Sequence, residues 1–354
     1  MNPSIPSLAA LTLIVSPAFA ETDVATLIDR GYYREADSRL AAAVAATPND
    51  PTTLACLAKV RAEQGRLDEA QKLAEKAVEA GPNLATTHFA LAEVCGERAG
   101  KASILKVPGF ARRFKKEVDA TLAIDPKNVD ALGALVQFHL QAPGIVGGDK
   151  KKIPALLDQI SAIDPAQGCM ARSEMAFRDK DSTQAVSWML KAVDAEKNGA
   201  DAHMALARHL SAPWRNPGKS EELAREALAR EPWRQDAWAL IVALAARAGR
   251  IEEMNETLAK AEAADPTRLG AYYTAGRQLL IDGKDLDRAE QCFRHYLTRE
   301  PEFGWPGHGG AHWRLGQILE KRGDRQGAIA EIETALKLQP ELDDAKKDLK
   351  RLKG

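Results

Sequence analysis

The stretch PTTLACLAKVRAEQGRLDEAQKLAEKAVEAGPNL, residues 51–84, has the pattern of a single helical hairpin. Gly65 interrupts the apolar helical pattern midway and allows the chain to turn, and Pro82 cannot continue the returning helix. The small side chains of Ala70 and Ala77 allow two helix backbones to approach closely. The stretch therefore predicts two antiparallel helices joined at the glycine.

The same spacing of a turn glycine, two packing residues and a closing proline recurs along the chain with a period of about 34 residues. Three further sets repeat its spacing: Gly31, Ala36, Ala43 and Pro48; Gly249, Met254, Ala261 and Pro266; and Gly323, Ala328, Ala335 and Pro340. Between these sets the pattern continues with insertions, which gives about nine units from Glu21 to Pro340. A chain of this kind buries its apolar surface between neighbouring units, not in one central core.

These residues resemble the tetratricopeptide repeat family, whose first helix carries a Leu-Ala or Leu-Gly pair, as in Leu57-Ala58 and Leu315-Gly316. The resemblance is closest over residues 51–84, 235–268 and 309–342. It implies an all-α fold, a right-handed α-solenoid of about nine helix-turn-helix repeats. It also implies a concave groove that binds a partner protein or peptide, without naming that partner.

The ends of the chain predict three regions. Residues 1–20 lack charged side chains, contain a short apolar run and end in Ala18-Phe19-Ala20, which indicates a signal peptide cleaved after Ala20. No Lys or Arg precedes the apolar run, so an uncleaved anchor is the alternative, although the run is too short to span a bilayer. We therefore expect a periplasmic protein whose solenoid covers 21–340. The charged residues 341–354 predict a C-terminal capping helix, which the last repeat of a solenoid requires.

Composition bears on the class of partner. The formal net charge is −1 and the isoelectric point is about 6.7, so the chain has no basic field for a phosphate backbone and we expect no nucleic acid partner. The four cysteines fall in four different repeats within apolar helical patterns. Cys56 and Cys95 lie on the first helices of neighbouring repeats. The sequence allows either a disulfide between them or two buried free thiols.

Three insertions interrupt the period, near 101–116, 142–152 and 302–310. The first is the most basic stretch of the chain; Arg112, Arg113, Lys115 and Lys116 flank Phe110 and Phe114. One interpretation of this insertion is a docking patch for an acidic partner or for anionic lipid headgroups, with any membrane contact peripheral. The other is a lengthened helix whose phenylalanines pack inward while the basic side chains stay in solvent.

The second insertion combines glycines with lysines but lacks the Gly-Lys-Ser/Thr order of a phosphate-binding loop. We expect a compact turn in which Gly147 and Gly148 adopt positive φ and Asp149 caps the element that follows. The third insertion is rich in glycine and aromatic residues and contains Phe303, Trp305 and His308.

Residues suited to catalysis or to cofactor binding are sparse. Only His308 and His312 have ligand-like spacing, but two glycines separate them and no cysteine or nearby carboxylate completes a metal set. There is no Gly-x-Ser-x-Gly motif, and the acidic residues alternate with basic ones as on solvated helix faces. The sequence predicts a protein that is not an enzyme and has neither metal nor cofactor.

The resemblance places the candidate binding residues on first helices, facing the concave surface. They are Lys59, Phe89, Glu93, Gln137, Arg247, Tyr273, Arg277, Trp313 and Gln317. The family's carboxylate clamp needs Lys and Asn pairs, which these positions lack. The aromatic members would instead take apolar side chains of a partner, and Arg247 and Arg277 would pair with acidic groups.

Three functions are compatible with these features. The leading hypothesis is a periplasmic scaffold that holds a protein partner in its groove. The second is an accessory protein that binds a small molecule or a solute-binding transport component, which predicts a pocket under the loop from Phe303 to Gly310. The third is an envelope-biogenesis factor whose basic patch, Arg112 to Lys116, touches membrane or cell wall.

Overall fold

A computed structural model describes residues 23–197, 199–212 and 215–354, and within these ranges every regular element is helical. The predicted signal peptide lies outside the described residues. The helices are α1 Val24–Asp29, α2 Tyr33–Ala46, α3 Pro51–Glu63, α4 Leu67–Ala80, α5 Ala85–Lys101, α6 Val107–Ile124, α7 Val129–Gln141, α8 Ile153–Ile163, α9 Pro165–Arg178, α10 Ser182–Ala195, α11 Asp201–Ser211, α12 Pro217–Arg230, α13 Gln235–Ala248, α14 Ile251–Ala264, α15 Gly270–Asp282, α16 Leu286–Tyr296, α17 His308–Lys321, α18 Arg325–Leu338 and α19 Asp343–Lys353.

The helices from α1 to α18 form nine successive hairpins of an α-solenoid, and α19 covers the last one. The hairpin of α3 and α4 shows why the helices begin, turn and pack where they do. The Asp50 side chain accepts a hydrogen bond from the backbone N–H of Thr53 and caps α3, and Gly65 turns the chain with a φ of +74°. Ala70 and Ala77 are fully buried between the helices, as the spacing predicted.

The first two insertions meet in space. Between α5 and α6 the chain makes a turn at residues 102–106, and α6 then runs for 18 residues as a lengthened helix. Between α7 and α8 lie two short 3-10 helices, η2 Gly144–Val146 and η3 Lys150–Lys152, and η2 contacts α6.

The turn chemistry of the second insertion is partly as predicted. Gly147 has a φ of +100°, and Asp149 caps η3 by accepting a hydrogen bond from the N–H of Lys151. Gly148 does not have the positive φ that we expected. A glycine is needed there for a different reason: an added Cβ would lie 1.8 Å from the carbonyl oxygen of Ala142.

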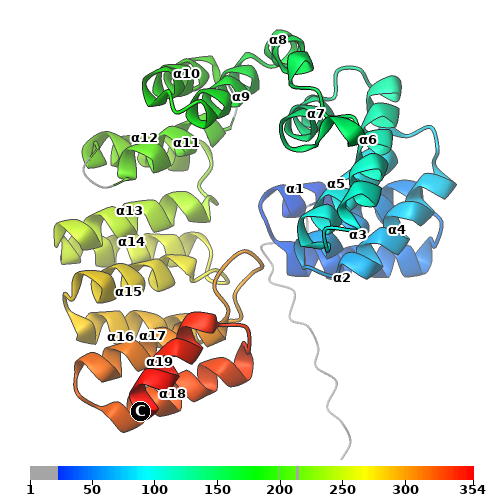
Figure 1. Ribbon diagram of the computed structural model, residues 1–354. Coiled ribbons are helices and arrows are strands. Elements are labelled where there is room, and N and C mark those ends of the chain that lie inside the picture. Colours follow the sequence, from blue (N-terminus) through cyan, green and yellow to red (C-terminus); the bar gives the residue numbers. More distant parts are fainter. Residues whose placement is uncertain (1–22, 198, 213–214) are drawn as a thin grey trace, which may run out of the picture.

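The hairpins follow an arc that brings the two halves of the chain together (Figure 1). The third insertion, between α16 and α17, reaches the first hairpin. The Arg34 guanidinium donates hydrogen bonds of 3.3 and 3.0 Å to the carbonyl oxygen of Pro301 and lies over the ring of Phe303. The solenoid is thus closed on itself by contacts between its first hairpin and its C-terminal half.

Helix α19 packs on the last hairpin. Ala345 and Leu352 are buried in a cluster with Ala328 and Ile332 of α18. Within the described residues, no helix combines the length and the apolar character needed to cross a membrane.

Candidate functional site

The first helices of four consecutive hairpins line a groove of about 660 Å³ on the N-terminal half of the solenoid. Four of the predicted binding residues lie in it: Lys59 from α3, Phe89 and Glu93 from α5, and Gln137 from α7. Lys59, Glu93 and Gln137 are each the ninth residue of their helix, so successive repeats present them at equivalent positions. Helix α9 adds a fourth wall.

The groove is acidic. Besides Glu93, it is lined by Asp130 and Glu174, whereas Lys59 is the one cation among its described lining residues. The Lys59 ammonium lies 3.6 Å from Glu93, and the Gln137 amide donates a 2.9 Å hydrogen bond to Glu174. Burial raises the pKa of Glu93, with Lys59 opposing the shift and Asp130 adding to it.

The floor of the groove is apolar. Phe89 is joined there by Met170, Met175, Phe177 and Met189. Methionine side chains are flexible and polarizable, and adapt to apolar groups of different shapes. A groove with an apolar floor and carboxylates at its wall suits a segment that carries both an apolar side chain and a cation.

Sequence reasoning missed the contribution of α9, which supplies Glu174 and two of the methionines. A signal was present, because Glu174 is the tenth residue of its helix, one place beyond the position shared by the three predicted polar residues. The fifth unit ends at Lys197 in place of a proline, which made the register of its helices harder to recognise.

The other predicted binding residues lie elsewhere. Arg247 donates long hydrogen bonds to the carbonyl oxygen of Ser211, at 3.3 Å, and to Gln278, at 3.4 Å. Arg277 is exposed on α15. Tyr273 is only 7% exposed and packs against Phe293 and Tyr296 in the core, so its placement on an accessible concave surface was wrong.

Trp313 and Gln317 face the capping helix. The indole N–H of Trp313 donates a 2.8 Å hydrogen bond to Asp348 of α19, and the Gln317 amide donates one of 3.1 Å to the same oxygen. These two side chains hold α19 in place, which corrects their placement in an open groove. The ring of Trp313 also packs in the cluster that buries Leu352.

A second cavity, of about 650 Å³, lies where the solenoid closes on itself. We call it the closure cavity. Tyr33 of the first hairpin, Trp233 of the α12–α13 turn, and Phe303 and Trp305 of the third insertion line it. Arg30 lies 4.0 Å above the Trp233 ring centroid, and Trp305 packs so tightly on Gly270 that an added Cβ would lie 2.5 Å from the indole.

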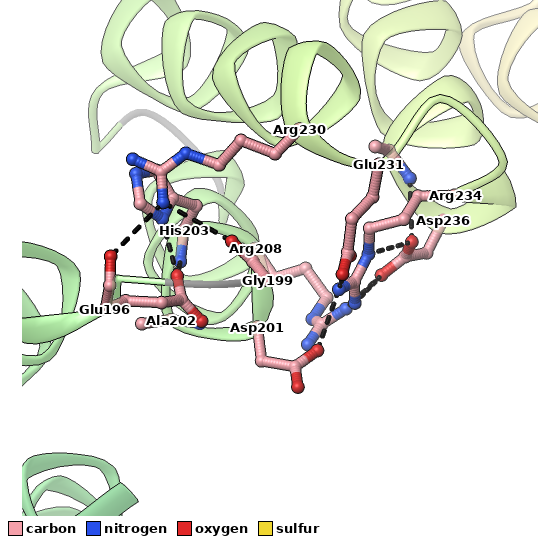
Figure 2. Close-up of polar contacts among 11 residues, drawn as sticks. Glu196, Gly199, Asp201, Ala202, His203, Arg208, Arg230, Glu231, Arg234 and Asp236 are labelled. Carbon is pink, nitrogen blue, oxygen red and sulfur yellow. Dashed lines mark hydrogen bonds and ion pairs between the residues drawn. The ribbon is translucent and has the colours of Figure 1, made fainter. Parts of the chain in front are cut away.

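One wall of the closure cavity is a network of charges around Arg234 (Figure 2). Its guanidinium donates hydrogen bonds to Asp201, at 2.7 Å, Glu231, at 2.8 Å, and Asp236, at 3.1 Å. Burial disfavours its charge, but the carboxylates outweigh that cost and raise the pKa of Arg234 above its usual value. Beside it, Gln235 is 5% exposed, and its amide atoms have no hydrogen-bond partner within the described chain.

The cysteines and histidines take part in packing and hydrogen bonds. All four cysteines are free thiols, Cys56 and Cys95 included, and burial raises the pKa of Cys95 to about 11. His308 donates to the carbonyl oxygen of Arg299, and His312 lies 2.7 Å from Glu331. Across the part of the chain that the structure describes, no group of three or more His, Cys, Asp or Glu residues is arranged to hold a metal ion.

Sequence comparison bears on both ends of the solenoid. Two family profiles for the tetratricopeptide repeat match, one over residues 26–94 and one over residues 309–342. Tetratricopeptide repeat profiles match both ends of the solenoid. The first match extends from the first hairpin to Val94 of α5 and so includes two of the four groove helices, α3 and part of α5. The second covers the last hairpin, on which α19 packs. No curated protein matches the chain.

Solved structures similar to this tetratricopeptide-like solenoid share little sequence with it. The crystal structure of yeast Tom70 is 12% identical, with 93% of this chain and 86% of that chain covered and a TM-score of 0.49. TTC0263, a thermophilic tetratricopeptide protein of Thermus thermophilus, is 18% identical, with 53% and 95% covered and a TM-score of 0.46. A human IFIT1 dimer with PPP-AAAA is 19% identical, with 93% and 79% covered and a TM-score of 0.45.

Proposed function

We propose that this protein is a periplasmic scaffold that binds a segment of a partner protein in the groove formed by α3, α5, α7 and α9. The observation that carries the proposal is the groove itself, in which Lys59, Phe89, Glu93 and Gln137 line one cavity. Tetratricopeptide repeat proteins generally mediate protein–protein interactions, and the two profile matches support the same class of function here. The periplasmic location is inferred from the apolar residues 1–20.

The groove favours a partner segment with an apolar side chain next to a lysine or arginine. Phe89 and the methionine floor would bury the apolar group, and Glu93 and Glu174 would pair with the cation alongside their present partners Lys59 and Arg178. Because burial raises the pKa of Glu93, a cation placed beside it would restore the preference for the charged carboxylate. Binding would therefore strengthen as the pH rises through the pKa of Glu93.

Site-specific photocrosslinking tests this function. A photoreactive amino acid at Gln137 of the tagged full-length chain, expressed in a Gram-negative host, should capture a partner in the periplasmic fraction, identified by mass spectrometry. The double variant Phe89→Ala, Glu93→Lys should lose the captured protein while keeping wild-type helicity. The matched control is Arg277→Ala, which alters an exposed residue of α15 outside the groove.

Either of two results would reject the groove as the binding site. One is capture that is equally strong in the double variant. The other is loss of capture in Arg277→Ala as well. The location is checked separately, because cleavage after Ala20 would leave Glu21 as the N-terminal residue of the protein recovered from the periplasm.

The closure cavity supports a second candidate, an accessory protein for a small molecule. The sequence predicted a pocket under the loop from Phe303 to Gly310, and the closure cavity is lined by Phe303 and Trp305. The aromatic walls and the unpaired amide of Gln235 would suit a planar or apolar ligand with hydrogen-bonding groups. Ligand-dependent thermal stabilisation of the wild type, reduced in Trp233→Ala, would support it; identical stabilisation in that variant would argue against it.

A further inference from the structure

Three large apolar side chains protrude into solvent where the first two insertions meet. Ile104 is 85% exposed, Leu105 is 89% exposed and Ile145 is 87% exposed, whereas the other exposed large apolar side chains of the described residues lie between 38% and 56%. Ile104 and Leu105 form the tip of the turn between α5 and α6, and Ile145 lies in η2. Single exposed aliphatic side chains are common, but several gathered on one surface mark an interaction site.

The two tips belong to one surface. Ile104 and Ile145 line a common cavity of about 570 Å³, and its walls are mainly apolar side chains of α6, α7 and η2, among them Phe114, Phe138 and Val146. The stem of Lys115 on α6 passes close to Gly147, so the two insertions are in contact behind the tips. We call this surface, formed by residues 101–116 and 142–152, the insertion face.

The insertion face is strongly basic. Residues 101–116 contain six basic side chains and no acidic one, and residues 142–152 contain three lysines and one aspartate. Three of these cations have carboxylate neighbours on their own helices: Lys101 with Glu97, Arg113 with Glu117 and Lys115 with Asp119. The other six are exposed and form no ion pair with any described residue; they are Lys106, Arg112, Lys116, Lys150, Lys151 and Lys152.

We propose that the insertion face docks on an anionic phospholipid bilayer. The aliphatic tips would enter the boundary between headgroups and acyl chains, and the unpaired cations would attract the lipid phosphates. A bilayer fits better than a protein partner, because the protruding side chains carry no hydrogen-bonding groups and no aromatic ring, which protein interfaces favour. The charge of the face is complementary to an anionic lipid surface, although the chain as a whole has a net charge of −1.

This docking leaves the proposed protein-binding groove available. Gln137 lines both the groove and the cavity of the insertion face, so the two cavities adjoin at this residue. A partner held by Glu93 and Glu174 would be presented close to the membrane. The docking proposal does not depend on the groove, because neither the protruding aliphatic side chains nor the unpaired cations line it.

Vesicle flotation of the purified mature chain tests the proposal. At low salt the wild type should bind vesicles of about one-quarter phosphatidylglycerol in phosphatidylethanolamine, should bind pure phosphatidylcholine at least tenfold more weakly, and should lose binding at high salt. The double variant Ile104→Ser, Leu105→Ser should bind the anionic vesicles about tenfold more weakly. Ile281→Ser, which changes a 56% exposed isoleucine of α15, should bind like the wild type.

Charge variants separate docking from general adsorption. Lys106→Glu should weaken binding about tenfold, whereas Lys321→Glu, an equal change of charge on exposed α17 surface, should have little effect. Absence of vesicle binding by the wild type at low salt would overturn the proposal. So would serine variants that bind like the wild type, since binding would then rest on charge without insertion of the tips. All of these side chains are exposed, so circular dichroism should show unchanged helicity in every variant.

Discussion

The hydroxyl of Tyr32 donates a 2.7 Å hydrogen bond to the buried carboxylate of Asp265, although 233 residues separate them in the chain. Arg268 strengthens the contact, because its guanidinium lies 3.7 Å from the centroid of the Tyr32 ring and donates a hydrogen bond to the carbonyl oxygen of Arg30. In an open solenoid each repeat touches only its neighbours. Here the first hairpin is also held by the turn between α14 and α15.

Replacing Tyr32 with phenylalanine should loosen this closure. Asp265 would lose one hydrogen bond while remaining 4% exposed, and a buried carboxylate that loses a partner costs about 1–3 kcal/mol. Hydrogen exchange should accelerate in α1 and α2, and small-angle scattering should show a larger radius of gyration. Tyr33→Phe is the control, because the Tyr33 hydroxyl forms no hydrogen bond within the described chain. Equal exchange in the two variants would show that Tyr32 does not hold the closure.

Glu93→Gln should stabilise the protein at neutral pH. Burial raises the pKa of Glu93, so the folded chain binds this proton more tightly than the unfolded chain does. Stability is therefore lost as the pH rises from the ordinary glutamate pKa through the raised value. Because the side chain is 34% exposed, we expect a gain of only about 0.5 kcal/mol at neutral pH, which disappears below about pH 4.

Thermal unfolding at neutral and acidic pH measures this difference. The control is Glu97→Gln, which changes a 58% exposed carboxylate one turn further along the same helix. A variant that is less stable than the wild type at neutral pH would mean that the ion pair with Lys59 outweighs the cost of burying Glu93.

Gly148→Ala should disrupt the second insertion. Its Cβ would lie 1.8 Å from the carbonyl oxygen of Ala142, which forces the backbone to move and should cost about 2 kcal/mol or more. Gly144→Ala, four residues earlier, would place its Cβ where no atom lies within 4 Å. The melting temperature should fall only in the first variant, and hydrogen exchange should rise in residues 142–152. A Gly148→Ala protein with wild-type stability would contradict this backbone geometry.

Trp313→Phe should loosen the capping helix. The phenyl ring keeps the apolar contact, but Asp348 loses the indole N–H, which should cost about 1 kcal/mol. Burial alone would raise the pKa of Asp348, but hydrogen bonds from Trp313, Arg351 and Gln317 outweigh it and hold that pKa below its usual value. The packing of α19 should therefore also loosen as the pH falls through the lowered pKa. Hydrogen exchange in α19 is the readout. Trp238→Phe, whose indole donates to the carbonyl oxygen of Pro232, should leave α19 unchanged.

The candidate groove shows how far the repeat register could predict a site. Lys59, Glu93 and Gln137 occupy the same position in three successive helices, so their common orientation follows from the period. Tyr273 occupies a first helix too, but it is buried because Phe293 and Tyr296 pack over it. Trp313 faces α19 because that helix packs on the hairpin of α17 and α18. Which first-helix residues stay accessible depends on the neighbours that each repeat has.

The nine hairpins could be predicted from the repeat pattern, because helix hydrogen bonds are local and most turns carry a glycine, although the fifth hairpin turns at Lys180 with a φ of +61°. The repeat pattern also determined where the period is interrupted. The folded arrangement of the repeats, and not their spacing, brings the interruptions at 101–116 and 142–152 together in one basic face. It alone decided that Arg34 reaches Pro301, 267 residues away. Such contacts depend on the sum of small rotations between successive repeats, and that sum is not visible in the spacing of any single repeat.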